Sequence, residues 1–239
     1  MRIIYLIPAY NEEDSLDKLA ANLSTQLSLF PQLQAYIIDN ASTDKTKAVI
    51  KALEVEHPWI HGIFAKEKGM GIAFRYAIRE MLGLQLSSED WIIFSAADLP
   101  FGFSDLEAFL EVKKKNPTCC TFVGSKSHPD SRINRSLKRA VASWVFYLLR
   151  LVFLKMHTKD PHGTIFLRAD HLNSADNIVS KDYFFSTELV YYMEQKSKVI
   201  EMPITLKPEI RPSKVNLIVD GTKVLKQIIH LRLRQIKKL

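Results

Sequence analysis

The chain has 239 residues, of which 47% are hydrophobic and 25% charged, so it can bury a real core and does not have the composition of a disordered chain. Its net charge of +7 allows acidic partners, namely phosphates, nucleic acid or an anionic membrane surface. The adjacent Cys119 and Cys120 exclude a disulfide framework and favour a reducing cytosol. We expect no secretory signal and no membrane-spanning helix, because the chain opens on a short strand and lacks a run of about 20 uncharged apolar residues.

The first hundred residues alternate short apolar runs with amphipathic segments. The apolar runs predict strands at residues 3–7, 35–38, 60–65 and 91–94. Apolar residues at helical spacing predict helices between them, at residues 14–30, 45–56 and 68–86. Such alternation is typical of right-handed βαβ units, which build a parallel sheet with helices on both faces.

The second half of the chain is less regular. Its pattern predicts a helix at 103–115 capped by Ser104, a strand at 121–124, a helix at 136–156, strands at 165–167 and 200–205, and a helix at 187–196. The helix at 136–156 is the most apolar of the chain, yet Arg150 lies in its middle. Two interpretations stay open: a buried core helix, or a helix in a membrane interface.

The tail at 223–239 has six Lys or Arg residues, no acidic residue, and apolar residues at helical spacing. This pattern indicates a basic amphipathic helix. Such a helix either binds an anionic bilayer or packs on the core with a solvated basic face. We favour the membrane, because the apolar helix at 136–156 would then act together with the tail.

Two of the predicted strands are followed by a carboxylate. Asp39 ends the run at 35–38, and Asp98 follows the run at 91–94 after three small residues. Ligands of open parallel sheets bind outside the carboxyl ends of the strands. We therefore expect Asp39 and Asp98 to share a pocket at one edge of the sheet.

Segments in both halves resemble motifs of family 2 glycosyltransferases. In the first half these are residues 7–13, residues 39–46, similar to the motif D-x-S-T-D-x-T, and residues 68–73, similar to its Gly-x-Gly turn. In the second half they are residues 124–126, 160–166, 185–189, 201–204 and 211–215, in the order found in dolichyl-phosphate mannose and glucose synthases. The resemblance covers about residues 1–215.

The resemblance implies an α/β fold of the GT-A type, Rossmann-like, with a mostly parallel sheet and additional C-terminal amphipathic helices. It divides the chain into a glycosyltransferase domain at 1–215, with a nucleotide-binding half at 1–100 and an acceptor half at 101–215, and a basic helix at 216–239. The donor would be a UDP- or GDP-hexose. The residues expected to bind it are Pro8, Ala9, Tyr10, Glu12, Asp39, Ala96, Ala97, Asp98 and Ser213.

The metal site implied by the resemblance is incomplete in this chain. The family usually has Asp-x-Asp after the fourth strand to hold Mg²⁺ or Mn²⁺ on the diphosphate, but here Ala96 replaces the first acid. Three accounts stay open: Asp98 holds a metal ligated chiefly by donor phosphates and water, His162 supplies a second ligand, or the site is metal-independent or inactive. We favour the first, with Mg²⁺ or Mn²⁺ as cofactor.

The acceptor implied by the resemblance is a polyprenyl phosphate, which needs cationic side chains to hold it beside another anion. Lys126 and Arg132 are the candidates, whereas Arg135 and Arg139 fit a solvated basic loop better. Arg211 and Lys214 would close a loop over the donor diphosphate. The catalytic set expected from the resemblance is therefore Asp98, Lys126, Arg132, Arg211 and Lys214, with Asp160 and Glu188 in the wall of the site.

The leading hypothesis is a cytoplasmic glycosyltransferase, peripherally bound to the membrane, that moves a hexose to polyprenyl phosphate with inversion at the anomeric carbon. One alternative keeps the donor but uses a cell-surface saccharide as acceptor. Another is a catalytically impaired nucleotide-sugar-binding protein, which Ala96 favours. We expect no nucleic-acid partner, because the basic charge is not accompanied by a recognition motif.

Overall fold

The computed structural model describes the backbone of residues 1–133, 137–207 and 217–236, and the side chains of these residues except 137–139 and 217–220. Its centre is a seven-stranded sheet in the order β3-β2-β1-β4-β6-β5-β7. The strands are β1 (Ile3–Ala9), β2 (Leu33–Asp39), β3 (Ile60–Phe64), β4 (Trp91–Phe94), β5 (Thr121–Gly124), β6 (Ile165–Arg168) and β7 (Val199–Met202).

The direction of one strand sets the layout of the sheet. β6 runs antiparallel to both of its neighbours, β4 and β5, whereas every other neighbouring pair is parallel. The prediction of a mostly parallel α/β sheet is therefore confirmed. Because β6 is reversed, the residues that precede it lie at the same edge as the carboxyl ends of β4 and β5.

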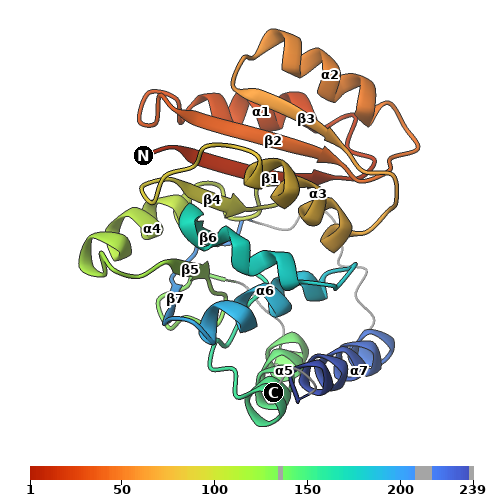
Figure 1. The fold of residues 1–239 in the computed structure, drawn as a ribbon, viewed down its shortest axis with the longest axis vertical. Helices are drawn as coiled ribbons and strands as arrows, with labels where there is room; N and C mark the ends of the chain where they lie inside the picture. Colours follow the sequence, from red (N-terminus) through yellow and green to blue (C-terminus); the bar gives the residue numbers. More distant parts are fainter. Residues whose placement is uncertain (134–136, 208–216, 237–239) are drawn as a thin grey trace.

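Helices cover both faces of the sheet (Figure 1). Strand residues alternate between two buried clusters, one shared with α1, α2 and α4 and the other shared chiefly with α3, α6 and η1. The helices are α1 (Leu16–Ser24), α2 (Thr46–Glu56), α3 (Met70–Leu82), α4 (Ser104–Lys115), α5 (Leu137–Leu154), the 3₁₀ helix η1 (Ala169–Asn177), α6 (Phe184–Glu194) and α7 (Leu217–Ile236).

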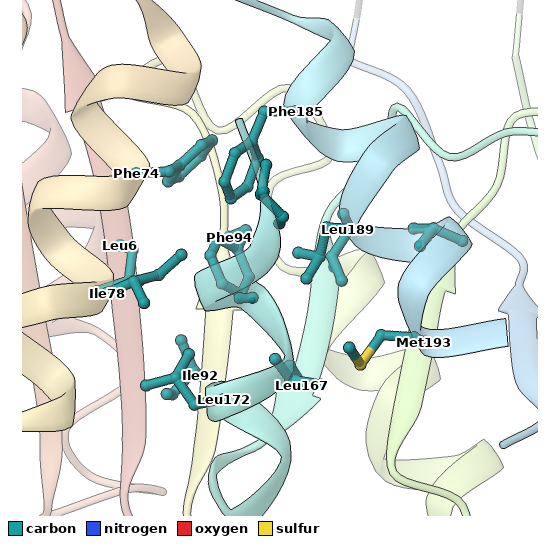
Figure 2. Close-up of a cluster of buried hydrophobic side chains, with 14 of the residues drawn as sticks. Leu6, Phe74, Ile78, Ile92, Phe94, Leu167, Leu172, Phe185, Leu189 and Met193 are labelled. Atoms are coloured by element: carbon teal, nitrogen blue, oxygen red, sulfur yellow. The ribbon is translucent and has the colours of Figure 1, made fainter. Parts of the chain in front are cut away.

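Three aromatic side chains lie at the centre of the second cluster (Figure 2). Phe74 of α3 packs edge-on against Phe94 of β4, with ring centroids 5.2 Å apart, and stacks on Phe185 of α6 at 4.9 Å. All three side chains are at most 3% exposed. They join the sheet to two helices that come from different halves of the sequence.

Several predicted element ends differ from the observed ones. The first helix ends at Ser24 rather than residue 30, where the Ser24 and Thr25 hydroxyls donate to the carbonyls of Ala21 and Asn22. The strand predicted at 200–205 ends at Met202, because Pro203 has no N–H for a ladder bond. Ser104 does not cap α4 with its side chain, since its hydroxyl donates to the carbonyl of Phe101.

The apolar helix α5 is buried on one side only. Arg150 is 3% exposed and donates through Nη2 to the carbonyl oxygen of Lys159 at 2.8 Å. The opposite side carries exposed apolar residues, including Trp144 at 60% and Val152 at 71%. A helix buried all round is therefore the wrong interpretation, and the charge of Arg150 is directed into the protein.

Helices α5 and α7 pack against each other at the end of the molecule away from β3 (Figure 1). Ile228 and Leu231 of α7 are fully buried, while Ile229, Leu233 and Ile236 are 38%, 49% and 52% exposed. Across the described residues, no helix combines the length and the apolar character that crossing a bilayer demands.

We predict that Phe74→Ala lowers the free energy of unfolding by about 3–5 kcal/mol, because it removes two ring contacts and leaves a cavity in the core. Urea denaturation followed by circular dichroism measures this loss. Val55→Ala is the control, since Val55 is 85% exposed, and it should shift the free energy by no more than about 0.5 kcal/mol. Equal losses for both variants would contradict the role of the aromatic cluster.

Candidate active site

The two carboxylates predicted to bind the donor lie at one edge of the sheet. Asp39 is the last residue of β2 and pairs with Ala9 of β1. Asp98 lies four residues beyond Phe94, the end of β4, on the other side of β1. Asp39 is 4% exposed, whereas Asp98 is exposed to solvent. The edge therefore presents one carboxylate from within the protein and one on its surface.

Short polar contacts join the turns after β1, β2 and β3. The amide of Ser42 donates to Oδ1 of Asp39 at 3.1 Å, and the amide of Gly69 donates to Oδ1 of Asn40 at 2.7 Å. The ammonium of Lys68 lies 3.4 Å from the ring centroid of Tyr10. A cation placed this close to an aromatic face is attracted by the ring quadrupole. Sequence reasoning missed Asn40 and Lys68. Lys68 contacts Tyr10, and its neighbour Gly69 bonds to Asn40, which follows Asp39, so the two residues link the turns of Tyr10 and Asp39.

Glu12 and Glu13 are both engaged in holding the turn after β1. The amide of Glu12 donates to Oγ1 of Thr46 at 2.8 Å, and Oε2 of Glu12 accepts from Oγ of Ser15 at 2.5 Å. Oε2 of Glu13 accepts from the amide of Lys45 at 2.9 Å. These bonds favour a structural role for the two acids, while Pro8, Ala9 and Tyr10 carry the turn itself.

Backbone strain gathers at the same edge. Among the described residues, four residues other than glycine have a positive φ. Three of them, Asn11 (53°), Ala41 (55°) and Leu99 (40°), follow β1, β2 and β4 respectively. Residues other than glycine rarely adopt this conformation, and such strain persists where function requires a particular backbone path. Leu99 is 3% exposed and directly follows Asp98, so its buried side chain anchors the strained turn.

A second group of polar residues lies where β5 ends and β6 begins. The carboxylate of Asp160 accepts from the amide of Lys126 at 2.9 Å and from the amide of His162 at 3.3 Å. The amide of Asp160 in turn donates to Oε1 of Glu201 at 3.1 Å. Asp160 is only 9% exposed. It therefore fixes the backbone at Lys126 and His162 from within the protein.

Burial and charge act in opposite directions on Asp160. Burial is the largest influence and raises its pKa, but the charges of Lys126 and His162 and the two amide bonds together bring the pKa below the usual value. His162 is exposed to solvent as a residue, but desolvation of its ring lowers its pKa to about 4; the charge of Asp160 opposes this shift, and the charges of Arg150 and Lys126 add to it. His162 is then neutral at pH 7, so at that pH the charges that stabilise the Asp160 carboxylate are those of Lys126 and Arg150.

The two cations predicted to bind the acceptor occupy the loop after β5. The ammonium of Lys126 lies 5.8 Å from the ring centroid of Phe101, which follows Asp98 by three residues. Arg132 is exposed, and its amide donates to the carbonyl of Ile204 at 2.8 Å. The loop after β5 thus comes beside the turn that carries Asp98.

Comparison with known proteins assigns the family. Residues 5–173 match the model of the family described as Glycosyl transferase family 2. The chain belongs to glycosyl transferase family 2. The match confirms the resemblance that the motifs of this glycosyltransferase indicated.

Two curated relatives are similar over nearly the whole chain. An undecaprenyl-phosphate mannosyltransferase from Micrococcus luteus is 28% identical over 232 residues, which are 94% of this chain and 92% of the relative. A dolichyl-phosphate β-glucosyltransferase from Saccharomyces cerevisiae is 24% identical over 254 residues, which are 95% of this chain and 73% of the relative. Both names place the acceptor among polyprenyl phosphates for those proteins.

Solved structures share the fold of this glycosyltransferase. Mannosyl-3-phosphoglycerate synthase from Rubrobacter xylanophilus superposes with a TM-score of 0.65 at 13% identity, covering 100% of this chain and 75% of its own. Glucosyl-3-phosphoglycerate synthase from Mycobacterium tuberculosis, in complex with Mg²⁺ and UDP, has a TM-score of 0.61 at 14% identity, covering 97% and 78%. At these identities the likeness establishes the GT-A fold alone.

The residues around Asp98 limit how a metal ion could be held. Among the described residues of this glycosyltransferase, no group of three or more His, Cys, Asp or Glu side chains could hold one. Nε2 of His162 lies 3.4 Å from Oγ1 of Thr187. Within the described part of the chain, Asp98 therefore offers one oxygen ligand, which fits a divalent cation whose other ligands come from elsewhere.

Some residues predicted for the site lie outside the described part of the chain, and one lies in the protein interior. Arg135, Arg211, Ser213 and Lys214 lie outside the described residues, as does the side chain of Arg139. Glu188 was expected in the wall of the site, and this expectation is wrong, because its side chain is fully buried and bonded to Ser180 and Arg234.

We predict that Asp160→Asn removes a pH-dependent part of the stability. The pKa of Asp160 is depressed in the folded state, so its contribution is present above the unfolded pKa, about 3.9, and is lost as pH falls through the folded pKa. Thermal unfolding between about pH 5 and pH 2 should show a shallower decline for the variant than for the wild type. Asp130→Asn, at a side chain that is 80% exposed, should keep the wild-type slope; a wild-type slope in Asp160→Asn would contradict the assignment.

Proposed function

We propose that this glycosyltransferase moves a hexose from a UDP- or GDP-sugar to a polyprenyl phosphate, with inversion at the anomeric carbon. The observation that carries the proposal is that the loop of Lys126 and the turn of Asp98 lie side by side at one edge of the sheet. The names of both curated relatives support the class of acceptor. Residues 1–100 would bind the nucleotide, residues 101–215 the acceptor, and residues 216–239 the membrane.

On the donor side, Asp39 would accept hydrogen bonds from the base, and the turn of Pro8, Ala9 and Tyr10 would line the base and ribose. Bonds to Ser42 and Asn40 hold this region before any ligand arrives. Ala96, Ala97 and Asp98 would approach the diphosphate, with Ser213 from the later loop. An acceptor group that is already fixed in place costs little reorganisation on binding.

The reaction needs no general base. An oxygen of the acceptor phosphate is already anionic and forms the bond to the anomeric carbon, while the bond from that carbon to the diphosphate oxygen breaks. The nucleoside diphosphate leaves with the electron pair, so no proton is transferred. Lys126 and Arg132 would hold the acceptor phosphate close to the donor diphosphate, which opposes the repulsion between two anions.

A divalent cation would neutralise charge on the leaving diphosphate. We infer that Asp98 is its protein ligand, and that His162 is a second ligand only if its ring turns from Thr187. Arg211 and Lys214 would add positive charge from the segment after β7. The structures of related fold include complexes with Mg²⁺ and UDP and with Mn²⁺ and GDP-mannose, which support a cation bound together with the donor.

The acceptor lipid implies contact with a membrane. Helices α5 and α7 pack together and share exposed apolar residues, and α7 adds the exposed basic residue Lys226. Apolar side chains next to Lys and Arg are the pattern of helices that lie in a membrane interface. We propose that this surface, the α5–α7 face, binds the anionic membrane peripherally and brings the site to the lipid phosphate.

The first test is transfer by purified protein to polyprenyl phosphate in vesicles, with a panel of radiolabelled UDP- and GDP-sugars and added Mg²⁺ or Mn²⁺. Asp98→Asn should lower turnover about a hundredfold or more, the order found when one charge-stabilising group is removed. Lys126→Met should lower it similarly while nucleotide affinity stays unchanged. Asp17→Asn and Lys18→Met, at exposed positions of α1, are the matched controls.

Other outcomes of this test separate the alternatives. Nucleotide-sugar binding by calorimetry with no turnover on any acceptor would favour an impaired binding protein, for which Ala96 is the supporting residue. Transfer to a saccharide instead of the lipid would favour the other alternative. Binding of no nucleotide sugar at all would overturn the proposed function.

We predict that Trp144→Glu and Val152→Glu each weaken binding to vesicles of anionic lipid about tenfold or more, because each places a charge where an apolar side chain would be buried. Vesicle flotation measures the bound fraction, and raising the salt concentration should lower it further by screening the basic residues. Val55→Glu on α2 is the control, since Val55 is exposed but distant from the α5–α7 face. Wild-type flotation by all three variants would contradict the assignment of this face.

A further inference from the structure

Two glycines at the amino-terminal turn of α3 accommodate a segment from the other half of the chain. A Cβ added to Gly69 would lie 2.4 Å from the carbonyl oxygen of Lys181, and one added to Gly71 would lie 2.2 Å from that of Ser180. No side chain fits at such distances. The Gly-x-Gly turn therefore lets the backbone of residues 180–181 approach, which is a packing role for glycine rather than a need for an unusual φ.

The same segment caps the helix. The amides of Gly71 and Ile72 donate to the carbonyl oxygen of Lys181 at 3.1 and 3.4 Å. The first amides of a helix have no partner within it and are often satisfied by a phosphate. In this protein a carbonyl from residues 179–182 takes that place. The position of the α3 turn therefore depends on the position of this segment.

A buried carboxylate also holds the segment at residues 179–182 in place. Glu188 of α6 is fully buried and accepts from the amide of Ser180 at 3.0 Å and from the Ser180 hydroxyl. It also accepts from Nη2 of Arg234, on α7, at 2.7 Å. A buried carboxylate that loses such partners is left with an uncompensated charge, so this arrangement is strongly determined.

Asp182 adds a second connection between the segment and α7. Its carboxylate accepts from Nε2 of Gln227 at 3.0 Å and from the ammonium of Lys223 at 2.5 Å. Residues 179–182 are thus bonded to α7 on one side and to the α3 turn on the other. That turn continues to the donor side, where Gly69 bonds to Asn40 and Lys68 lies over Tyr10.

We propose that Glu188 is a positioning residue for the donor site, and that residues 179–182 form a connector through which the docking of α7 sets the α3 turn. Glu188 is too deeply buried to touch a ligand, so it acts through Ser180, Lys181 and Gly69. The proposal rests on the proposed function for the identity of the ligand. It adds that donor affinity depends on contacts that α7 makes far along the sequence.

The first experiment titrates UDP and GDP, with Mg²⁺ or Mn²⁺, into full-length wild type and Glu188→Gln by calorimetry. The Gln side chain keeps the shape of Glu188. Its NH₂ group, however, is a donor in place of one carboxylate oxygen and would face the donors of Ser180 or Arg234. Donor affinity should fall about tenfold, within the usual range for coupling between sites, and the KM for the nucleotide sugar should rise more than kcat falls. Unchanged affinity in a folded variant would overturn the proposal.

Glu194→Gln is the matched control on the same helix. Glu194 accepts from the amides of His157 and Thr158 at 2.9 and 2.7 Å, so its loss disturbs a comparable set of bonds away from residues 179–182. Its nucleotide affinity should equal that of the wild type even if its melting temperature falls as much. An equal loss of affinity in both variants would mean that lowered stability, and not positioning, explains the effect.

Hydrogen–deuterium exchange tests the connector without any nucleotide. The amides of residues 69–75 should exchange faster in Glu188→Gln and in Arg234→Gln than in the wild type or in Glu194→Gln, and the double variant should show less than the sum of the two effects. Unaltered exchange there overturns the positioning role. If the wild type binds no nucleotide while this exchange pattern holds, the proposed function fails and the connector stands.

Discussion

The reversal of β6 is the constraint on which the site depends. In a purely parallel sheet, the chain would reach the carboxyl edge only where strands end. Because β6 runs antiparallel between β4 and β5, residues 160–164 reach that edge from the opposite direction. The hydroxyl of Thr164 donates to the buried Asp105 of α4 at 2.5 Å, which fixes this entry. Asp160 thereby comes close enough to hold the amide of Lys126.

Buried or partly buried carboxylates that accept backbone amides recur throughout the molecule. Asp90 accepts from the amides of Arg2 and Ser87. Burial raises the pKa of Asp90, but hydrogen bonds from the Arg2 side chain and from these two amides hold it far below the usual value. Glu201 accepts from residues 159 and 160, and Glu188 from residue 180. Loops outside the strands cannot rely on ladder bonds, so side chains accept hydrogen bonds from their amides instead.

The pair α5 and α7 combines two surfaces with different roles. Its inner side carries charge into the protein: Arg150 reaches the carbonyl of Lys159 beside Asp160, and Arg234 reaches Glu188. Its outer side leaves Trp144, Val152 and Leu233 exposed. The helices proposed to meet the membrane are therefore each bonded to a segment that leads to one half of the site. Contact with the lipid and order at the site would then depend on the same two helices, through different side chains.

The sequence by itself determined the βαβ alternation of the first hundred residues, the placement of Asp39 and Asp98 after strands, and the family. These features are local, because short apolar runs and turn residues express them within a few positions. The α1 end and the failed cap at Ser104 were missed, since side-chain hydroxyls there bond to nearby carbonyls instead of supporting the expected helix ends.

Only the tertiary structure decided the direction of β6, the burial of Arg150 and Glu188, and the contact of residues 180–181 with Gly69 and Gly71. These features depend on contacts between different segments of the chain, and such contacts produce no periodic pattern in the sequence. A Glu within an apolar helix and a Gly-x-Gly turn are each compatible with several roles. The physical reason is that hydrogen bonds and close packing between distant segments depend on geometry, which forms only when the whole sheet is assembled.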